Sequence, residues 1–321
     1  MSNVRVNAAD NELNVGGTGE GFGVYGLGGM NYGMNTVSAW LSGKLRIGRF
    51  DTSEDMNLHG VGIFDARLSP DDLKLAHDIH RQLCEAVEAG PRDELPRIDP
   101  PRLYDVDCLR QGKHVHYQGP IYQLPSALAD TLVDFFWRTR SAYLRESRTV
   151  VRLDAEVVNV ERLRSKFLVS IRLINSGYYP IMMDTPDKWS TVMGYQLDFG
   201  GGKVDDKAAV WGASLAGLPL VNQSEFPDGK VVVPARGSVV FKFLTLPDEK
   251  FTRGTYMFNV VVNASVHAPD VSPSMGRVNF HSDTGKRIPI TFDRDWPSTS
   301  EELEEYEARQ REQMSLQPVY P

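Results

Sequence analysis

The segment Val150-Val151-Arg152-Leu153-Asp154-Ala155-Glu156-Val157-Val158 alternates apolar and charged residues, and this alternation predicts a β-strand with one buried face. A period of two places one side of a strand in a core and the other side in water. Similar short segments follow as far as Val266, and turn-forming residues such as Asn175-Ser-Gly177 separate them. We therefore expect two packed antiparallel sheets over residues 148–295.

Three patterns in this region each join a strand to a specific turn. They are Phe167-Leu-Val-Ser-Ile-Arg-Leu-Ile-Asn175-Ser-Gly177-Tyr-Tyr-Pro180, Val233-Pro-Ala-Arg-Gly237-Ser-Val-Val-Phe241 and Phe251-Thr-Arg-Gly254-Thr-Tyr256-Met-Phe258. Over about residues 148–266 the chain resembles the immunoglobulin-like β-sandwich modules of bacterial envelope and secreted proteins. The resemblance implies that Tyr256 closes a corner of the sandwich, and it brings no catalytic or binding residues with it.

Residues 1–89 are expected to form a small glycine-rich β unit that ends in a helix. Ser69 has the properties of an N-cap, Pro70 suits the first helical position, and Gly90-Pro91 ends the helix. A proline-rich connector follows at 90–103, then a hairpin and a second helix at 104–147, and an acidic tail at 296–321. The predicted class is therefore mainly β with some α (α+β).

The composition is that of a soluble globular protein. The chain of 321 residues is 41% hydrophobic and 24% charged, with a net charge of −7. It has no basic stripe, which argues against a nucleic-acid partner, and no apolar run long enough for a membrane-spanning segment. The first thirty residues include Asp10, Glu12 and Glu20, so they are not a signal peptide as written. The compartment stays open: periplasmic if a signal peptide was removed, otherwise cytoplasmic.

Two cysteines, Cys84 and Cys108, leave two possibilities open. They form a disulfide, which would stabilise the fold by about 3 kcal/mol, or they remain unpaired thiols.

Two sequence motifs suggest catalysis or cofactor binding, and we interpret both as structural. Gly21-Phe-Gly-Val-Tyr-Gly26 satisfies G-x-G-x-x-G, but the residues after it cannot open the helix that a dinucleotide site needs. Gly212-Ala-Ser214-Leu-Ala-Gly217 approaches a nucleophile elbow, yet Leu218-Pro219 prevents the helix that follows such an elbow. A serine hydrolase using Ser214 and a downstream His267 or His281 remains an alternative, and we predict no cofactor.

Three groups of residues have the types of side chain that bind metals. They are the Asp51–Asn57 segment, with oxygen ligands at alternate positions, the helical set His77, His80 and Cys84, and the strand pair His114 and His116. Each group also has a simpler interpretation: the first as an acidic surface turn, the second as residues at the margin of a helix's apolar stripe, and the third as exposed strand residues. We therefore predict no metal site.

Aromatic and apolar residues near loops or strand ends of the sandwich are the candidates for a contact surface. They are Tyr178, Tyr179, Ile181, Met182, Trp189 and Trp211. We expect a non-enzymatic bacterial protein-binding protein, possible examples being an immunity or inhibitor protein that neutralises a toxin or effector enzyme. The alternatives are a structural subunit of an envelope or secretion assembly, in which the acidic tail contributes to assembly, and the Ser214 hydrolase.

Overall fold

The computed structural model describes residues 19–26, 35–52, 59–90, 102–206, 210–247, 249–271, 275–283 and 287–316. Within these residues the chain is an α+β protein dominated by antiparallel strands. The helices are α1 (Pro70–Ala89), α2 (Ser126–Tyr143) and α3 (Ser300–Leu316). The strands are β1 (Gly21–Tyr25), β2 (Thr36–Trp40), β3 (Lys44–Arg49), β4 (Val61–Arg67), β5 (Leu103–Arg110), β6 (Lys113–Pro120), β7 (Arg148–Leu163), β8 (Lys166–Asn175), β9 (Ile181–Asp184), β10 (Gln196–Lys203), β11 (Val210–Ser214), β12 (Lys230–Val233), β13 (Gly237–Thr245), β14 (Gly254–Val266), β15 (Gly276–His281) and β16 (Pro289–Phe292).

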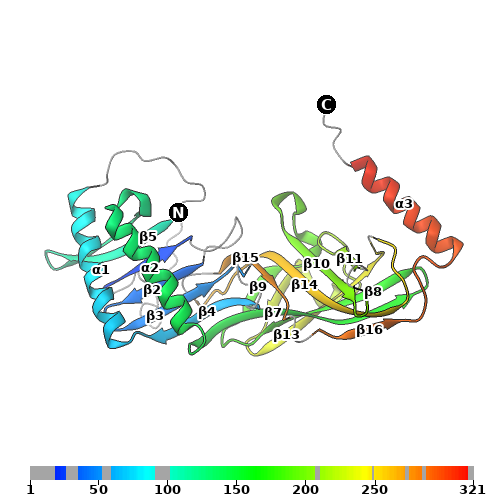
Figure 1. Cartoon of the computed structure of the whole chain (residues 1–321), viewed down its shortest axis with the longest axis horizontal. Helices are drawn as coiled ribbons and strands as arrows, with labels where there is room; N and C mark the ends of the chain where they lie inside the picture. The colour runs from blue at the N-terminus through cyan, green and yellow to red at the C-terminus, as the bar shows by residue number, and fades with distance from the viewer. Residues whose placement is uncertain are drawn as a thin grey trace.

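One long sheet organises the molecule. Its nine strands lie in the order β13-β8-β7-β4-β3-β2-β1-β5-β6 and extend along the long axis (Figure 1). A second sheet has the order β11-β10-β14-β15, with β16 paired to β14, and β12 and β9 form a two-stranded sheet. No helix of the described residues is long and apolar enough to cross a membrane.

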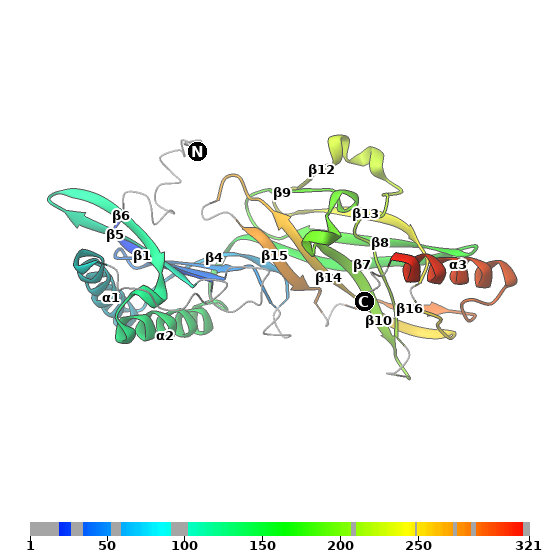
Figure 2. The same cartoon turned by 90° about the horizontal axis from the view of Figure 1, so that it is seen from above.

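The long sheet contributes to two separate cores. At one end α1 and α2 cover one face of β1–β5, where Phe22 of β1 packs on Phe135 of α2 with ring centres 5.3 Å apart (Figure 2). At the other end, apolar residues of β7, β8 and β13 share a core with the second sheet, and Phe167 of β8 meets Trp211 of β11 there. Burial of these large apolar side chains is the main stabilising contribution at both ends.

The first helix is confirmed together with its predicted ends. The Ser69 side chain accepts a hydrogen bond from the backbone N–H of Asp72, Pro70 occupies the first turn, and Gly90 at the C-cap has φ 88°. Positive φ is a conformation that glycine adopts readily, so the helix ends there. Buried Ala76 and Ile79 point α1 toward the sheet.

The predicted hairpin and second helix are also confirmed. Strands β5 and β6 pair from Leu103↔Pro120 to Arg110↔Lys113, and Gln111 and Gly112 reverse the chain with positive φ. The hairpin extends from one end of the molecule (Figure 2). The G-x-G-x-x-G motif forms β1, a strand without a following helix in the described residues.

The long sheet crosses the boundaries that we expected between residues 89 and 148. Strand β4 pairs with β7, for example Val61 with Leu153 and Asp65 with Arg148. β7 has 16 residues, which is long enough to pair with β8 and still reach β4. The glycine-rich unit and the C-terminal strands are consequently one continuous sheet.

The C-terminal segment, which we expected to be an acidic tail, is in part built into the fold. Trp296 is buried and stacks on Phe251 with ring centres 6.2 Å apart. Residues Ser300–Leu316 form α3, which lies at the opposite end of the molecule from α1 and α2 (Figure 1). Polar contacts described below hold the start of this helix.

At the predicted sandwich corner, Tyr256 is buried and its hydroxyl donates a hydrogen bond to the backbone carbonyl of Thr252 at 2.8 Å. A buried tyrosine needs such a partner for its hydroxyl, and here a residue four positions upstream supplies it.

Candidate partner-binding surface

The turn after β8 is built around the buried side chain of Asn175. Its Nδ2 donates to the carbonyls of Tyr179 at 2.8 Å and Val233 at 3.3 Å, and its Oδ1 accepts from the N–H of Gly177 at 2.9 Å. Gly177 is required because a Cβ there would lie 2.3 Å from the Cα of Val151. The Asn-Ser-Gly motif therefore fixes the position of the residue that follows it.

That residue, Tyr178, is exposed and lies between two arginines. Its ring centre is 5.0 Å from the guanidinium carbon of Arg148 and 4.3 Å from that of Arg236, and the residue is 45% exposed. Its backbone N–H donates to the carbonyl of Val150 at 2.7 Å. The hydrogen bond and positive charge of Arg236, together with Arg148, lower the pKa of the Tyr178 hydroxyl. The result is a preorganised cation–π stack.

Arg236 is held in a conformation that non-glycine residues rarely adopt. Its φ is 52°, and its backbone N–H donates to the carbonyl of Gly177 at 3.0 Å. Such left-handed positions cost about 1 kcal/mol or more and persist where the surrounding structure imposes them. The hydrogen bond to Gly177, in the turn after β8, thus keeps the Arg236 side chain over Tyr178.

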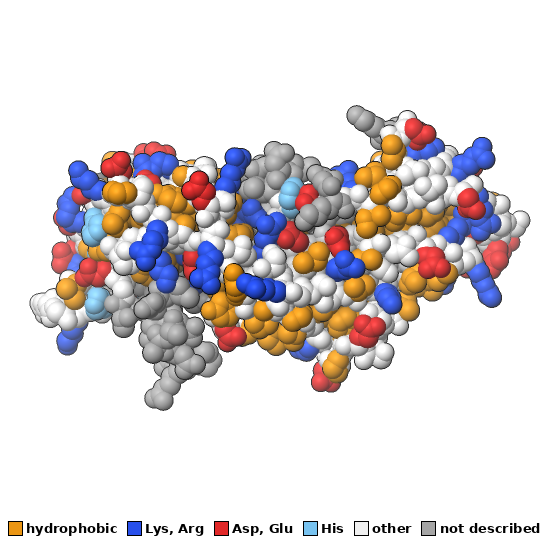
Figure 3. All heavy atoms as spheres, turned by 90° about the horizontal axis from the view of Figure 1, so that it is seen from below, with side chains coloured by type: hydrophobic (Ala, Val, Ile, Leu, Met, Phe, Trp, Pro, Cys, Tyr) orange, Lys and Arg blue, Asp and Glu red, His pale blue; other side chains and the backbone are white. Residues whose placement is uncertain are grey.

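A shallow groove of about 440 Å³ adjoins this stack. It is lined by Arg172, Ile174, Asn175, Ser176, Arg236, Gly237 and Ser238. Arg172 pairs with Glu156 at 2.6 Å, whereas neither Arg148 nor Arg236 forms an ion pair with a carboxylate among the described residues. Seen from below, on the side where β7 and β13 lie in Figure 1, hydrophobic, basic and acidic side chains are interspersed (Figure 3). Of the two arginines that line the groove, Arg172 therefore has an internal counter-charge, whereas Arg236 has none among the described residues.

Three of the six candidate contact residues are core residues, which corrects our expectation. Ile181, Trp189 and Trp211 are 0%, 6% and 1% exposed. Trp211 stacks on Phe251 with ring centres 4.8 Å apart, and the indole N–H of Trp189 donates to the carbonyl of Asp184 at 2.9 Å. These aromatics fill the space between sheets, so they are unavailable to a partner.

The remaining candidates lie near the surface. Tyr179 is partly buried against the core, while Met182 of β9 is 38% exposed. Met182 faces Val232 of β12, which is 51% exposed, across the small two-stranded sheet. Tyr178 and Met182 are therefore the predicted residues that a partner can reach.

Sequence reasoning missed Arg148 and Arg236. A usable signal was present at Arg236, because Val233-Pro-Ala-Arg-Gly237 was already identified as a turn and arginine is an unusual residue for a tight turn. Arg148 carried no such local signal, since it reaches Tyr178 only through strand pairing.

The possible zinc ligands His80 and Cys84 lie on α1, close to Cys108 of β5. Cys84 and Cys108 form a disulfide, and the Cys84 sulfur lies 3.8 Å from Nε2 of His80. His77 is exposed and lies outside this group. Because the two sulfurs are bonded to each other, this cluster has no thiolate that could bind a metal. Of the two possibilities for Cys84 and Cys108, the structure has the disulfide.

The possible calcium segment falls mostly outside the described residues, because 53–58 are not among them. Asp51 itself is buried and its backbone pairs with Asn279 of β15. Asp51 therefore does not lie in an exposed acidic turn.

Ser214 is the last residue of β11 and is exposed. A turn containing Gly217, with φ 80°, follows it in place of the helix of a nucleophile elbow. Among the described residues Ser214 has no hydrogen bond to a histidine. The arrangement lacks the activating base that a catalytic serine requires.

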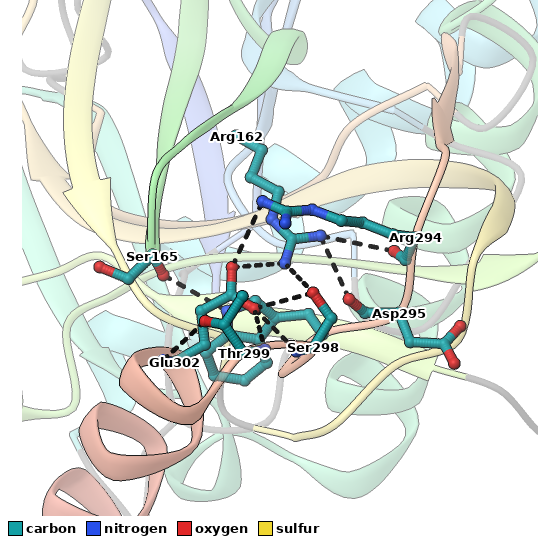
Figure 4. Close-up of polar contacts among 8 residues, drawn as sticks. Arg162, Ser165, Arg294, Asp295, Ser298, Thr299 and Glu302 are labelled. Atoms are coloured by element: carbon teal, nitrogen blue, oxygen red, sulfur yellow. Dashed lines mark hydrogen bonds and ion pairs between the residues drawn. The ribbon is translucent and has the colours of Figure 1, made fainter.

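A second surface feature is the anchored start of α3 (Figure 4). Arg162 of β7 forms an ion pair with Glu302, and its guanidinium also donates to the carbonyl of Asp295 and the hydroxyl of Ser298, both at 3.2 Å. Glu302 accepts from the backbone N–H groups of Ser298 at 2.7 Å and Thr299 at 3.2 Å. These contacts satisfy N–H groups at the start of the helix.

No family model matches the sequence, and no curated protein matches it at a significant level. The chain has 14% identity and a TM-score of 0.22 to Northeast Structural Genomics Consortium target SoR45, over 44% of this chain and 85% of that one. The putative ApaA protein from Bordetella pertussis has 9% identity and a TM-score of 0.19, over 47% of this chain and 94% of that one. The thioester domain of the Enterococcus faecium TIE86 protein has 11% identity and a TM-score of 0.18, over 88% of this chain and 99% of that one. TM-scores this low support no argument about function.

Proposed function

We propose that this chain is a non-enzymatic protein-binding protein. Its immunoglobulin-like β-sandwich presents a surface formed by Arg148, Tyr178 and Arg236, the Tyr178 surface, to an acidic segment of a partner protein. The observation that carries the proposal is the stack of Arg148, Tyr178 and Arg236. Two arginines without a carboxylate partner in the described parts of the chain flank an exposed tyrosine.

Tyrosine and arginine are the residue types that most often dominate binding energy at protein interfaces. The stack holds both types in place before binding, which lowers the conformational entropy lost on association. The chain as a whole carries a net charge of −7, whereas this surface carries two arginines without a carboxylate partner in the described parts of the chain. An acidic partner segment would be attracted to these arginines.

A structural subunit of a larger assembly is a second candidate, and α3 is the observation that favours it. Arg162 and Glu302 fix the start of a 17-residue helix at one end of the molecule. Most of its described side chains are exposed and several are acidic. A fixed acidic helix is suited to contact a basic surface of a neighbouring subunit.

The experiment is site-specific photo-crosslinking in the native host. A photoreactive phenylalanine analogue replaces Tyr178 in one strain and Val192, which is 95% exposed, in a control strain. A partner that crosslinks from Tyr178 and not from Val192 supports the proposal, and its affinity is then measured with purified proteins. Crosslinks of the same protein from both positions would contradict a defined surface.

The non-enzymatic part has its own test. A fluorophosphonate probe should leave the wild-type protein unlabelled, because Ser214 lacks a histidine partner among the described residues. Labelling that disappears in Ser214→Ala would replace the binding proposal with the hydrolase alternative.

A further inference from the structure

The hairpin β5–β6 has one apolar face and one acidic face. Tyr104, Val106 and Cys108 of β5 belong to the core under the helices. Because side chains alternate along a strand, Asp105 and Asp107 project from the opposite face. Both aspartates are nonetheless buried, at 7% and 2% exposed.

Two histidines of β6 lie on this acidic face. The strand register pairs His116 with Asp107 and His114 with Leu109, so both histidines project from the same side as the aspartates. Nδ1 of His116 lies 3.0 Å from Oδ1 of Asp107. The His116 side chain is 43% exposed and His114 is exposed, so this side of the cluster is open to solvent.

The carboxylates of this cluster are incompletely paired. Oδ2 of Asp107 and Oδ1 of Asp105 are buried and have no hydrogen-bond partner in the described parts of the chain. Oδ2 of Asp105 accepts a hydrogen bond from Tyr25 at 2.7 Å. A buried carboxylate oxygen without a donor is unfavourable unless a cation or a further donor compensates for it.

We propose that Asp107, His114 and His116 bind a divalent transition metal ion of the zinc class. Imidazole nitrogen and carboxylate oxygen are ligands of such ions, with metal–ligand bonds of about 2.0–2.1 Å. Two ligands of one tetrahedral ion are then about 3.3 Å apart, close to the separation of the Asp107 and His116 atoms. His114, exposed on an edge strand, completes the set through rotation of its side chain, and the neighbouring Asp105 adds negative charge.

The ion supplies what the cluster lacks. Bound at Oδ1 of Asp107, it offsets the charge of that carboxylate, whose Oδ2 is buried without a hydrogen-bond partner in the described parts of the chain, and of the adjacent Asp105. The three ligands leave a fourth position for water or for an atom of a bound molecule. This site is separate from the Tyr178 surface and does not depend on the function proposed for it.

The test uses the full chain, freed of metal with a chelator and titrated with Co²⁺, with Zn²⁺ as competitor. Visible absorption bands of low-symmetry Co²⁺ that Zn²⁺ abolishes are the expected result. His114→Ala and His116→Ala should each weaken binding by about tenfold or more, and Asp107→Asn by a similar factor. His77→Ala, an exposed histidine on α1, should bind as the wild type does. Equal binding by the wild type and the His114→Ala/His116→Ala double variant, or no Co²⁺ spectrum at all, would overturn the proposal. His114 is exposed, so its variant tests the site without disturbing the buried aspartate.

Discussion

Arg162 and Glu302 are 140 residues apart in sequence, and their ion pair joins β7 to the start of α3. The two side chains are only 10% and 3% exposed. α3 has no apolar stripe to bury, and Tyr306 is its side chain that packs on the core, with its ring centre 5.5 Å from that of Trp296. The ion pair and the associated hydrogen bonds determine where this helix begins.

Glu302→Gln should therefore destabilise the protein. Burial alone would raise the pKa of Glu302, but hydrogen bonds from Arg162 and Ser298 outweigh it and lower the pKa to about 2, from 4.5. The carboxylate thus stabilises the folded state above pH 4.5, and this contribution is lost as the pH falls through 2. We expect Glu302→Gln to lower the free energy of unfolding by about 3 kcal/mol at pH 7 in urea titrations. The exposed Glu304→Gln serves as control, and equal effects of the two changes would contradict the account.

Asp105 should produce the opposite pH dependence. Burial raises its pKa from 3.8 to about 6, despite the hydrogen bond from Tyr25 and the charge of His116, and Asp107 raises it further. The folded state then holds a proton that the unfolded state releases, so stability is greatest below pH 3.8 and falls as the pH rises through 6. The expected decrease is about 3 kcal/mol at most, measured by urea unfolding with a chelator present.

Asp105→Asn removes this titration and should be more stable than the wild type at pH 7. The exposed Asp130→Asn should keep the wild-type profile. Parallel profiles of wild type and Asp105→Asn between pH 4 and 7 would show that the carboxylate does not titrate as described.

Reduction of the Cys84–Cys108 bond should destabilise the helix-covered end of the molecule. The bond closes a loop with a sequence separation of 24, for which the entropy lost by the unfolded chain corresponds to about 3 kcal/mol. Urea unfolding with and without a thiol reductant measures the difference. The Cys84→Ser/Cys108→Ser double variant should resemble the reduced protein and show no response to reductant. An unchanged midpoint on reduction of the wild type would contradict the prediction.

Gly177→Ala should displace the turn that carries Tyr178. The added Cβ would lie 2.3 Å from the Cα of Val151 and 2.6 Å from the carbonyl oxygen of Val150, both of which are backbone atoms. We expect a loss of about 2 kcal/mol or more in the free energy of unfolding. Gly202→Ala is the matched control, because nothing lies within 4 Å of the Cβ that it adds. Similar losses in both variants would indicate a general effect of replacing glycine in this fold.

Local features were predictable from the sequence. Ser69, Pro70 and Gly90 act through neighbouring backbone groups, so the pattern alone located α1. The alternation from Val150 to Val158 similarly located β7, because the period of a strand does not depend on its partners.

Non-local features were not predictable in the same way. Arg148 and Arg236 are far apart in sequence and meet at Tyr178 only after β7, β8 and β13 pair. The aromatic residues Trp189 and Trp211 looked like surface anchors because periodicity cannot show which strand end another sheet covers. The pairing of β4 with β7 was missed for the same reason.

The most direct test of the central claim is the affinity of the partner that crosslinks at Tyr178, measured by calorimetry with purified proteins. Arg236→Glu should weaken binding by about tenfold or more, and Tyr178→Ala by a similar factor, with far-UV circular dichroism unchanged. Arg253→Glu, which makes the same charge change at another exposed position, should bind as the wild type does. Unchanged affinity in Arg236→Glu and Tyr178→Ala would contradict the assignment of this surface.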